Sequence, residues 1–434
     1  MEKAEKRRKR KQPNEDINVS TIIEEVTARK IFDSRGEETI EVDVTTAAGF
    51  GRASAPAGAS RGKAEAVPYP EGGVNEAIRR VEELIAPELI GMEADEQKEV
   101  DILLHEIDKT EDFRNVGGNT AYAVSLAVAE AAATSYGVPL FQHLAGYLAS
   151  ELPYPLGNVL GGGKHAHGKT PDIQEFLVLP LKARVFSDAA KANVFVYQKV
   201  GSILQKKDVA FTGGRGDEGA WAPNIKNEEA LEIMAKACEE ASGELGVDCR
   251  VGVDVAASTL WKPKENCYIY NQDGVKRSSG EQLDFMTHLI EKFNLAYVED
   301  PFHEEDFESF AELTKKVKKC LVCGDDLFVT NRKRLAEGVR VDAANAIIIK
   351  TNQVGTLTDA WEATKAARKA HYMPVMSHRS GETTEAHIAH LAVAFHCPII
   401  KTGVVEGARV AKINELIRIE ETLGNRAAMP IFSF

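Results

Sequence analysis

Apolar and polar residues follow different rhythms in the two parts of the chain. Between residues 20 and 70 they alternate, as in TIEVDVTTAAG, which is typical of half-buried strands. From residue 74 to about residue 148, apolar residues recur every three or four positions, as in AYAVSLAVAEAAATSYG, and this spacing predicts amphipathic helices. Strands followed by helices predict a compact α+β domain, which we place at residues 20–152.

Short apolar runs characterise the second part, which begins where Pro153 and Pro155 mark a boundary. Each run ends in an ionisable residue, and after the first interval these ends recur every 23–28 residues. Amphipathic stretches such as EQLDFMTHLIEKF fill the intervals, so residues 153–434 are predicted to form a parallel β/α barrel. The prediction is an α/β protein with a C-terminal TIM-like barrel and a smaller N-terminal α+β domain. The run-ending residues are Asp254, Glu299, Asp325, Lys350, His378 and Lys401.

These six residues predict one shared site. Buried parallel strands are usually apolar throughout, yet each run here becomes polar at its carboxyl end. In a β/α barrel those ends meet at one rim, where the active sites of this fold lie. One charged residue after a strand is usually the solvated start of a loop, but that interpretation does not account for six in series.

The acidic members of this set predict a metal site. Asp254, Glu299 and Asp325 would offer three oxygen ligands to a hard divalent cation such as Mg²⁺. The alternative, in which each carboxylate pairs with a barrel lysine, leaves an excess of buried negative charge. Lys350 and Lys401 would face the cation, whose charge should lower the pKa of a lysine and make it a general base. This arrangement suits removal of a proton beside a carboxylate.

Two further polar clusters lie in loops. Gln174 and Glu175 belong to PDIQEF, and Asp217 and Glu218 belong to GRGDEGAWAPN, whose glycines allow close approach of backbone to a ligand. A glutamate among other acids can keep its proton near neutral pH and give it to a leaving hydroxyl. Acidic pairs on loops are also often only solvated, so neither cluster is sufficient alone.

Charge and composition narrow the classes of function. The chain has 53 basic and 66 acidic residues, a net charge of −13, and residues 1–19 are predicted to be a disordered basic tail. The acidic remainder disfavours nucleic-acid binding, which would rest on the tail alone. With no apolar run of membrane length and no signal peptide, we expect no membrane partner. Six sparse cysteines fit a cytoplasmic location, and we assign the single C-x-x-C, Cys320 and Cys323, to core packing rather than to zinc.

Ordered motifs from about residue 22 to about residue 424 closely resemble the enolase (phosphopyruvate hydratase) family, and archaeal and bacterial members most. The series runs DSRG-x-x-TIEV, GAS-x-G, IQEF, GDEG, VEDPF, DDL-x-VTN, K-x-NQ-x-GTL, SHRSGET and IKTG. The resemblance implies a magnesium-dependent hydro-lyase of glycolysis and gluconeogenesis. Such an enzyme interconverts 2-phosphoglycerate and phosphoenolpyruvate.

The same resemblance implies residue roles. Lys350 would remove the C2 proton, while Glu218, assisted by Glu175, would protonate the leaving hydroxyl, and His165 would close over the substrate on a mobile loop. Two Mg²⁺ are implied, the first on Asp254, Glu299 and Asp325 and the second on Ser60 together with the substrate phosphate. The remaining implied substrate contacts are Lys401 at the carboxylate, Arg379 and Ser380 at the phosphate, and Gln174 and His378.

Several positions depart from the family pattern. Arg61 adds a charge beside Ser60, which leaves open a second interpretation: a catalytically impaired enolase-like paralogue that acts as a binding protein. A third is another acid-sugar dehydratase or racemase, but those enzymes normally lack the phosphate clamp that SHRS implies. The family also forms dimers and octamers, and by motif position Glu41 and Arg409 would pair across a dimer contact.

Overall fold

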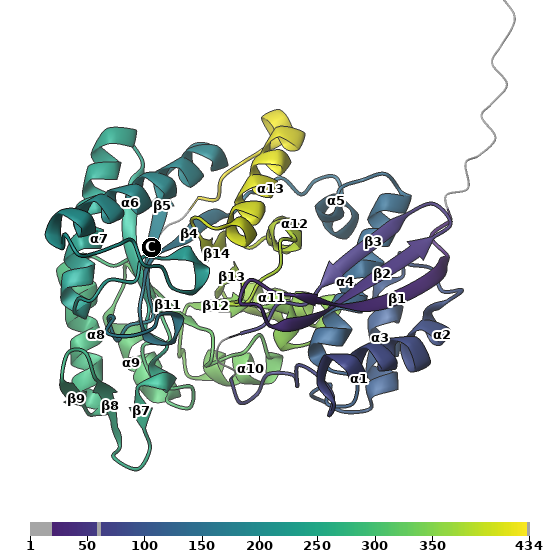
Figure 1. Cartoon of the computed structure of the whole chain (residues 1–434), viewed down its shortest axis with the longest axis horizontal. Helices are drawn as coiled ribbons and strands as arrows, with labels where there is room; N and C mark the ends of the chain where they lie inside the picture. Colours follow the sequence, from purple (N-terminus) through teal and green to yellow (C-terminus); the bar gives the residue numbers. More distant parts are fainter. Residues whose placement is uncertain (1–19, 59–61, 432–434) are drawn as a thin grey trace, which may run out of the picture.

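The computed structural model describes residues 20–58 and 62–431. The predicted basic tail and Ser60 with Arg61 therefore lie outside the described residues. Figure 1 shows two parts side by side, a smaller N-terminal part and a larger barrel. No helix in the described ranges is long and apolar enough to cross a membrane.

A three-stranded antiparallel sheet forms one layer of the N-terminal part. Its strands are β1 (Ile23–Phe32), β2 (Glu38–Thr46) and β3 (Phe50–Ser54). Asp33 closes the β1–β2 turn because its side chain accepts hydrogen bonds from the backbone N–H groups of Arg35 and Glu37. The helices of this part are α1 (Gly73–Arg80) with its π-helical continuation Val81–Ile85, α2 (Ala86–Leu89), α3 (Gln97–Asp108), α4 (Gly118–Ser135) and α5 (Leu140–Ala145).

Helix α4 packs directly on this sheet, and glycine makes the close approach possible. A Cβ at Gly51 would lie 2.0 Å from the carbonyl oxygen of Ala127. Nearly every residue of α4 is buried, because the sheet covers one side and the barrel region covers the other. The alanine-rich sequence of this helix therefore reflects burial all round rather than a solvent-facing stripe.

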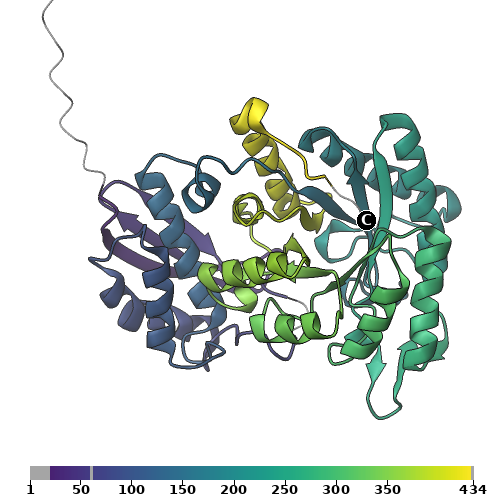
Figure 2. The same cartoon turned by 180° about the vertical axis from the view of Figure 1, so that it is seen from behind.

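Eight strands close the barrel in the order β10-β11-β12-β13-β14-β4-β5-β6. They are β4 (Tyr154–Gly161), β5 (Glu175–Leu181), β6 (Asp248–Asp254), β10 (Tyr297–Glu299), β11 (Leu321–Gly324), β12 (Ala346–Ile349), β13 (Met373–Ser377) and β14 (Ile399–Gly403). The helices around it are α6 (Phe186–Lys207), α7 (Asn227–Leu245), α8 (Ser279–Phe293), α9 (Phe307–Lys316), α10 (Arg332–Arg340), α11 (Leu357–Lys369), α12 (His387–Ala394) and α13 (Gly407–Leu423). A small sheet of β7 (Trp261–Lys262), β8 (Cys267–Tyr270) and β9 (Val275–Arg277) projects from one end (Figures 1 and 2).

The barrel is not parallel throughout, which corrects one expectation. Strand β5 runs antiparallel to both of its neighbours, β4 and β6. The connection from β4 to β5 contains no crossover helix, so the chain returns as a hairpin. As a result Glu175, at the start of β5 rather than at its end, pairs in register with Asp254 at the end of β6.

Candidate active site

Strand register places three acids next to one another along the barrel rim. Glu175 pairs with Asp254, and Asp254 pairs with Glu299 on the next strand. Lys401, on β14, reaches across to all three from the other side of the barrel. Its ammonium nitrogen lies 2.8 Å from Glu299 Oε2, 3.0 Å from Asp254 Oδ2 and 3.2 Å from Glu175 Oε2. One buried cation therefore holds these three carboxylates together.

Lys350, just after β12, is paired with Asp325, just after β11. Burial opposes the charged lysine, but Asp325 and Glu299 favour it, and on balance the pKa of Lys350 is raised above its ordinary value. The expected lowering of that pKa is therefore not a property of the protein's own groups. It would require a cation that competes with Lys350 for Asp325.

A second cluster lies opposite Lys350 in the same cavity. His165 Nδ1 lies 3.3 Å from Glu175 Oε1 and 3.7 Å from Glu218 Oε1. Burial works against a charged imidazole, yet Glu218 and Glu175 together raise the pKa of His165 to about 9. Burial also works against the carboxylates, but nearby positive groups lower the pKa of Glu175 and lower that of Glu218 further. The expectation of a raised carboxyl pKa is thus wrong for both residues: the cluster's proton resides on His165.

The backbone of Glu218 is unusual. It adopts φ 69 and ψ 7, a left-handed conformation that is uncommon outside glycine. Gly403 on β14 permits this turn to approach the barrel, since a Cβ there would lie 2.3 Å from the carbonyl oxygen of Glu218. Asn158, from β4, donates a hydrogen bond of 2.8 Å to Glu218 Oε2.

The residues predicted to bind substrate line the same cavity. Arg379 is buried and forms an ion pair of 3.1 Å with Glu65, and it also donates to Asn352 Oδ1 at 2.9 Å. Ser380 follows it, and His378 Nε2 lies 3.2 Å from Glu218 Oε2. The cavity is small, with a volume of about 30 Å³. Its lining residues include Gln174, Glu175, His165, Glu218, Asp254, Asp325, Lys350, His378, Arg379, Ser380 and Lys401.

Several contributors to the site were not predicted from the sequence, and three of them contact predicted site residues directly. Glu65 pairs with Arg379, Asn158 contacts Glu218, and Gln353 donates to Asp325 Oδ1 at 2.9 Å. A buried asparagine within the apolar run YPLGNVLG was a usable signal for Asn158. Glu65 lies in a loop of the N-terminal part, so its place beside the site depends on the contact between the two parts of the chain, whereas Gln353 lies in a 3₁₀ helix that directly follows Lys350.

The donor set fits a hard divalent cation. Glu299 is fully buried, and burial followed by the proximity of Asp254 raises its pKa well above the ordinary value. Its Oε1 atom has no hydrogen-bond partner among the described residues. An enclosed group of carboxylate oxygens with excess negative charge is what Mg²⁺ or Ca²⁺ coordinates.

The tightest groupings of potential ligands in the described chain differ from the predicted triad. Asp300, Asp325 and Asp326 have oxygens within 4.8 Å of one another, as do ligand atoms of His165, Glu175 and Glu218. Asp300 is already engaged, because its two oxygens accept the backbone N–H groups of Asp325 and Asp326. Between the predicted ligands Asp254 and Glu299 lies the Lys401 ammonium instead.

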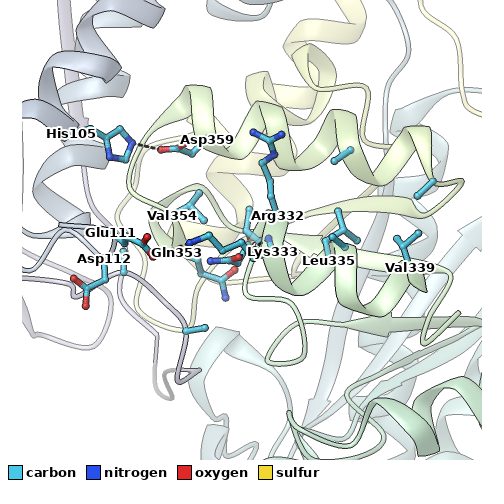
Figure 3. A pocket seen from close by; sticks show the side chains of 17 residues that line it. His105, Glu111, Asp112, Arg332, Lys333, Leu335, Val339, Gln353, Val354 and Asp359 are labelled. Atoms are coloured by element: carbon cyan, nitrogen blue, oxygen red, sulfur yellow. Dashed lines mark hydrogen bonds and ion pairs between the residues drawn. The ribbon is translucent and has the colours of Figure 1, made fainter. Parts of the chain in front are cut away.

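A separate cavity of about 740 Å³ lies between the two parts of the chain, away from the reacting side chains (Figure 3). His105 and Asp359 meet across it at 2.8 Å, and Lys333 pairs with Glu111. Leu335 and Val339 form its apolar wall. A large volume therefore does not by itself mark the functional site, because the predicted ionisable residues line the smaller cavity instead.

The cysteine prediction is consistent with this structure. Cys320 and Cys323 are both free and buried. Burial raises the pKa of the Cys323 thiol well above its ordinary value, which disfavours the thiolate that zinc requires.

The predicted contact between Glu41 and Arg409 finds no support within the chain. Arg409 is 0% exposed and donates to the carbonyl oxygens of Arg379 and Ser380. Glu41 pairs with Arg29 at 2.7 Å. Arg409 is thus enclosed by its own subunit and is not presented to a partner.

Comparison with known proteins agrees with this geometry. The family description "Enolase, C-terminal TIM barrel domain" matches residues 149–431, and "Enolase, N-terminal domain" matches residues 23–144. The enolase of Methanothermobacter thermautotrophicus is 54% identical over 406 residues, which cover 93% of this chain and 98% of that protein. The enolase of Pyrobaculum aerophilum is 48% identical over 413 residues, covering 94% and 98%. On these matches, together with the closed barrel and its smaller N-terminal partner, the chain belongs to the enolase family.

Proposed function

We propose that the chain catalyses the reversible dehydration of 2-phosphoglycerate to phosphoenolpyruvate, the enolase reaction, with Lys350 as the base at C2. The observation that carries the proposal is the lining of one buried cavity. Lys350 lies on one side, Glu218 and His165 lie on the other, and Arg379 supplies a cation for phosphate. Family membership supports the reaction class, and the residues that line this cavity include a candidate for each chemical step.

Proton removal is assigned to Lys350. Its ammonium is held by Asp325, so the free amine forms only when that carboxylate is shared. Asp254, Glu299 and Asp325 would hold the first magnesium ion, which would supply positive charge to stabilise the enolate. Lys401, which already neutralises three carboxylates, is positioned to hold the substrate carboxylate.

Loss of the hydroxyl is assigned to the opposite cluster. Glu218 delivers a proton to the C3 hydroxyl; the C–O bond breaks, its electron pair leaves with the oxygen, and water departs. At neutral pH the cluster holds this proton on His165, whose Nδ1 lies 3.7 Å from Glu218 Oε1. Glu175 contacts the same imidazole and assists the transfer.

Substrate binding is assigned to the remaining lining residues. Arg379 would exchange its pairing with Glu65 for the phosphate, since a guanidinium binds two oxygens in parallel. Ser380, Gln174 and His378 complete the contacts. The assignment of Arg379 to a phosphate also disfavours an acid-sugar dehydratase, whose substrate normally has no phosphate. No described residue favours a non-catalytic paralogue.

Three coarser expectations belong to this proposal. A second Mg²⁺ would rest on Ser60, which lies outside the described residues. We propose a cytoplasmic enzyme, an assignment supported by six free cysteines. We also propose at least a homodimer, from family membership alone.

The decisive experiment follows the ultraviolet absorbance of phosphoenolpyruvate in wild type and in Lys350→Ala. Wild type should convert 2-phosphoglycerate with Mg²⁺ and lose activity with EDTA. Lys350→Ala should lose about 10²–10⁴-fold in kcat, the usual range for a general base. Lys276→Ala, at an exposed ion pair with Glu265, is the matched control and should behave as wild type. Wild-type turnover in Lys350→Ala would refute the assignment.

A further inference from the structure

Arg409 lies behind the active site rather than in it. It belongs to α13, is 0% exposed, and points toward the segment that follows β13. Its Nη1 lies 2.9 Å from His378 Nδ1 and 2.6 Å from the carbonyl oxygen of Arg379. Its Nη2 donates to the carbonyl oxygen of Ser380 at 2.6 Å. One guanidinium therefore contacts three consecutive residues that line the active-site cavity.

The contact with His378 determines which ring nitrogen carries the proton. A guanidinium has five N–H donors, no acceptor, and keeps its charge. Nδ1 of His378 must therefore accept, so in the neutral ring the proton is on Nε2. A doubly protonated ring would turn an N–H toward the guanidinium and place two cations in contact. Arg409 thus excludes both the other tautomer and the cation.

The protonated nitrogen faces Glu218. His378 Nε2 lies 3.2 Å from Glu218 Oε2, and Asn158 donates to the same oxygen at 2.8 Å. A proton on Oε2 would meet donors from both neighbours. The other oxygen, Oε1, lies toward Nδ1 of His165, the group from which a proton can arrive.

We infer that Arg409 is a positioning residue for the elimination step: it fixes His378 as the Nε2–H tautomer, so that Glu218 takes and delivers its proton through Oε1. The inference rests on the proposed role of Glu218 as proton donor. It assigns to Arg409 a function inside its own subunit, distinct from a subunit contact. Arg409 touches no reacting atom, and its effect on the proton transfer is exerted through His378.

Arg409 also supports the backbone of Arg379 and Ser380, so its loss will loosen this segment whether or not it controls the His378 tautomer. A role limited to this support must therefore be distinguished by measurement. Lys412, one turn further along α13, offers a matched comparison. It is equally buried and holds the same segment through the carbonyl oxygen of Thr383 and the carboxylate of Glu382, without contacting His378.

The first test is ¹⁵N NMR of histidine-labelled wild-type enzyme at neutral pH, with the His378 signals assigned by their loss in His378→Gln. The expected spectrum has a proton on Nε2 and none on Nδ1. A proton on Nδ1 in the wild type would overturn the inference. This measurement needs no Arg409 variant, so it stands even if such variants fail to fold.

The second test separates the two proton transfers in Arg409→Met. Exchange of the C2 hydrogen of 2-phosphoglycerate with D₂O reports on Lys350 alone, whereas dehydration also needs Glu218. Dehydration should fall about 10²-fold while exchange stays within a few-fold of wild type, as expected for loss of a general-acid contribution. Arg409→Lys, which restores a donor to Nδ1, should recover most of the dehydration. Equal loss of both rates, or wild-type dehydration in Arg409→Met, would overturn the inference.

Controls separate this inference from the function on which it rests. Lys412→Met should lower thermal stability and raise KM, and should leave the ratio of the dehydration rate to the exchange rate unchanged. If Lys412→Met also changes this ratio, loosening of the segment after β13 is enough to explain the Arg409→Met result, and the inference is overturned. Glu218→Gln should lose dehydration and keep exchange. If it instead keeps dehydration, the proposed acid is wrong whatever the tautomer. If Glu218→Gln behaves as expected but the NMR spectrum shows a proton on Nδ1 of His378, only the proposed role of Arg409 is refuted.

Discussion

The burial of Glu299 is unfavourable for folding stability, yet the same position suits its predicted role as a metal ligand. It is fully buried at the end of β10, and burial together with Asp254 raises its pKa well above the ordinary value. Lys401 and the hydroxyl of Tyr297 both contact its Oε2, at 2.8 and 2.6 Å, while Oε1 has no hydrogen-bond partner in the described part of the chain. The surroundings of Glu299 therefore disfavour its charged form, which a divalent cation bound there would stabilise.

We predict that Glu299→Gln separates these two effects. Without metal, the variant should be at least as stable as wild type, because a buried charge is removed while Lys401 keeps two other carboxylates. Millimolar Mg²⁺ should raise the thermal midpoint of wild type through preferential binding to the folded state, and should raise that of the variant much less. Thermal melts with EDTA and with Mg²⁺ check this. An equal Mg²⁺ shift in both proteins would show that Glu299 is not a ligand.

The sequence was sufficient to predict which residues line the candidate site, but not which of them are charged. The ends of apolar runs pointed to Asp254, Glu299, Asp325, Lys350 and Lys401, because the chemistry of a strand end is visible in order along the chain. The pKa of Glu218 is lowered against the effect of burial by groups far away in sequence such as His165, whereas a raised value was expected. Asp325 likewise favours the charged form of Lys350, and the lowered pKa of Lys350 beside a divalent cation stays a prediction. Coulombic shifts follow distance, which the sequence does not contain.

Strand β5 shows what an apolar run predicts about a strand and what it does not. The run predicts that the strand is buried, but not whether it runs parallel or antiparallel to its neighbours. The hairpin from β4 reverses it, and this reversal brings Glu175 to the rim at the strand's first residue. Elements from both parts of the chain also meet at α12, where His387 lies between Glu130 of α4 and Glu385.

We predict that His387 stabilises this junction in a pH-dependent way. Burial opposes its charge, but Glu130 and Glu385 raise its pKa to about 10, from 6.5. A histidine with a raised pKa contributes stability that is complete below about pH 6.5 and is lost as the pH rises through about 10. The free energy of unfolding of wild type should therefore exceed that of His387→Gln by roughly 2–4 kcal/mol at pH 6.5, and by clearly less at pH 10.

Urea unfolding at several pH values measures this difference. His288→Gln, at an exposed position on α8, is the control and should change the free energy of unfolding by less than about 0.5 kcal/mol. A difference between wild type and His387→Gln that stays constant from pH 6.5 to 10 would refute the charged bridge.

For the whole molecule, the two parts are joined by polar contacts that also shape the site. Backbone hydrogen bonds link Ala57 and Gly381 in both directions, and Asp101 of α3 accepts from the backbone and side chain of Thr358. Glu65, supplied by the N-terminal part, pairs with Arg379 of the barrel. The candidate active site therefore forms only when the N-terminal part is packed against the barrel in this arrangement.

We predict at least a dimer in solution, because the chain belongs to a family that forms dimers and octamers. Light scattering at micromolar concentration should give about twice the chain mass of 47.4 kDa, or more. Since Arg409 is enclosed by its own subunit, Glu41→Gln should leave that mass unchanged. A monomer in wild type would contradict the first expectation, and dissociation caused by Glu41→Gln would contradict the second.

The sequence alone determined the barrel, its smaller partner, the reaction family and most of the residues that line the candidate site. Each of these rests on local information: the period of apolar residues, the residue that ends a strand, and short motifs in a given order. The tertiary structure decided the direction of β5, the place of Asn158 and Glu65, the charge states of Lys350 and Glu218, and the enclosure of Arg409. These depend on which distant groups come within a few ångströms, and only the folded chain brings those groups together.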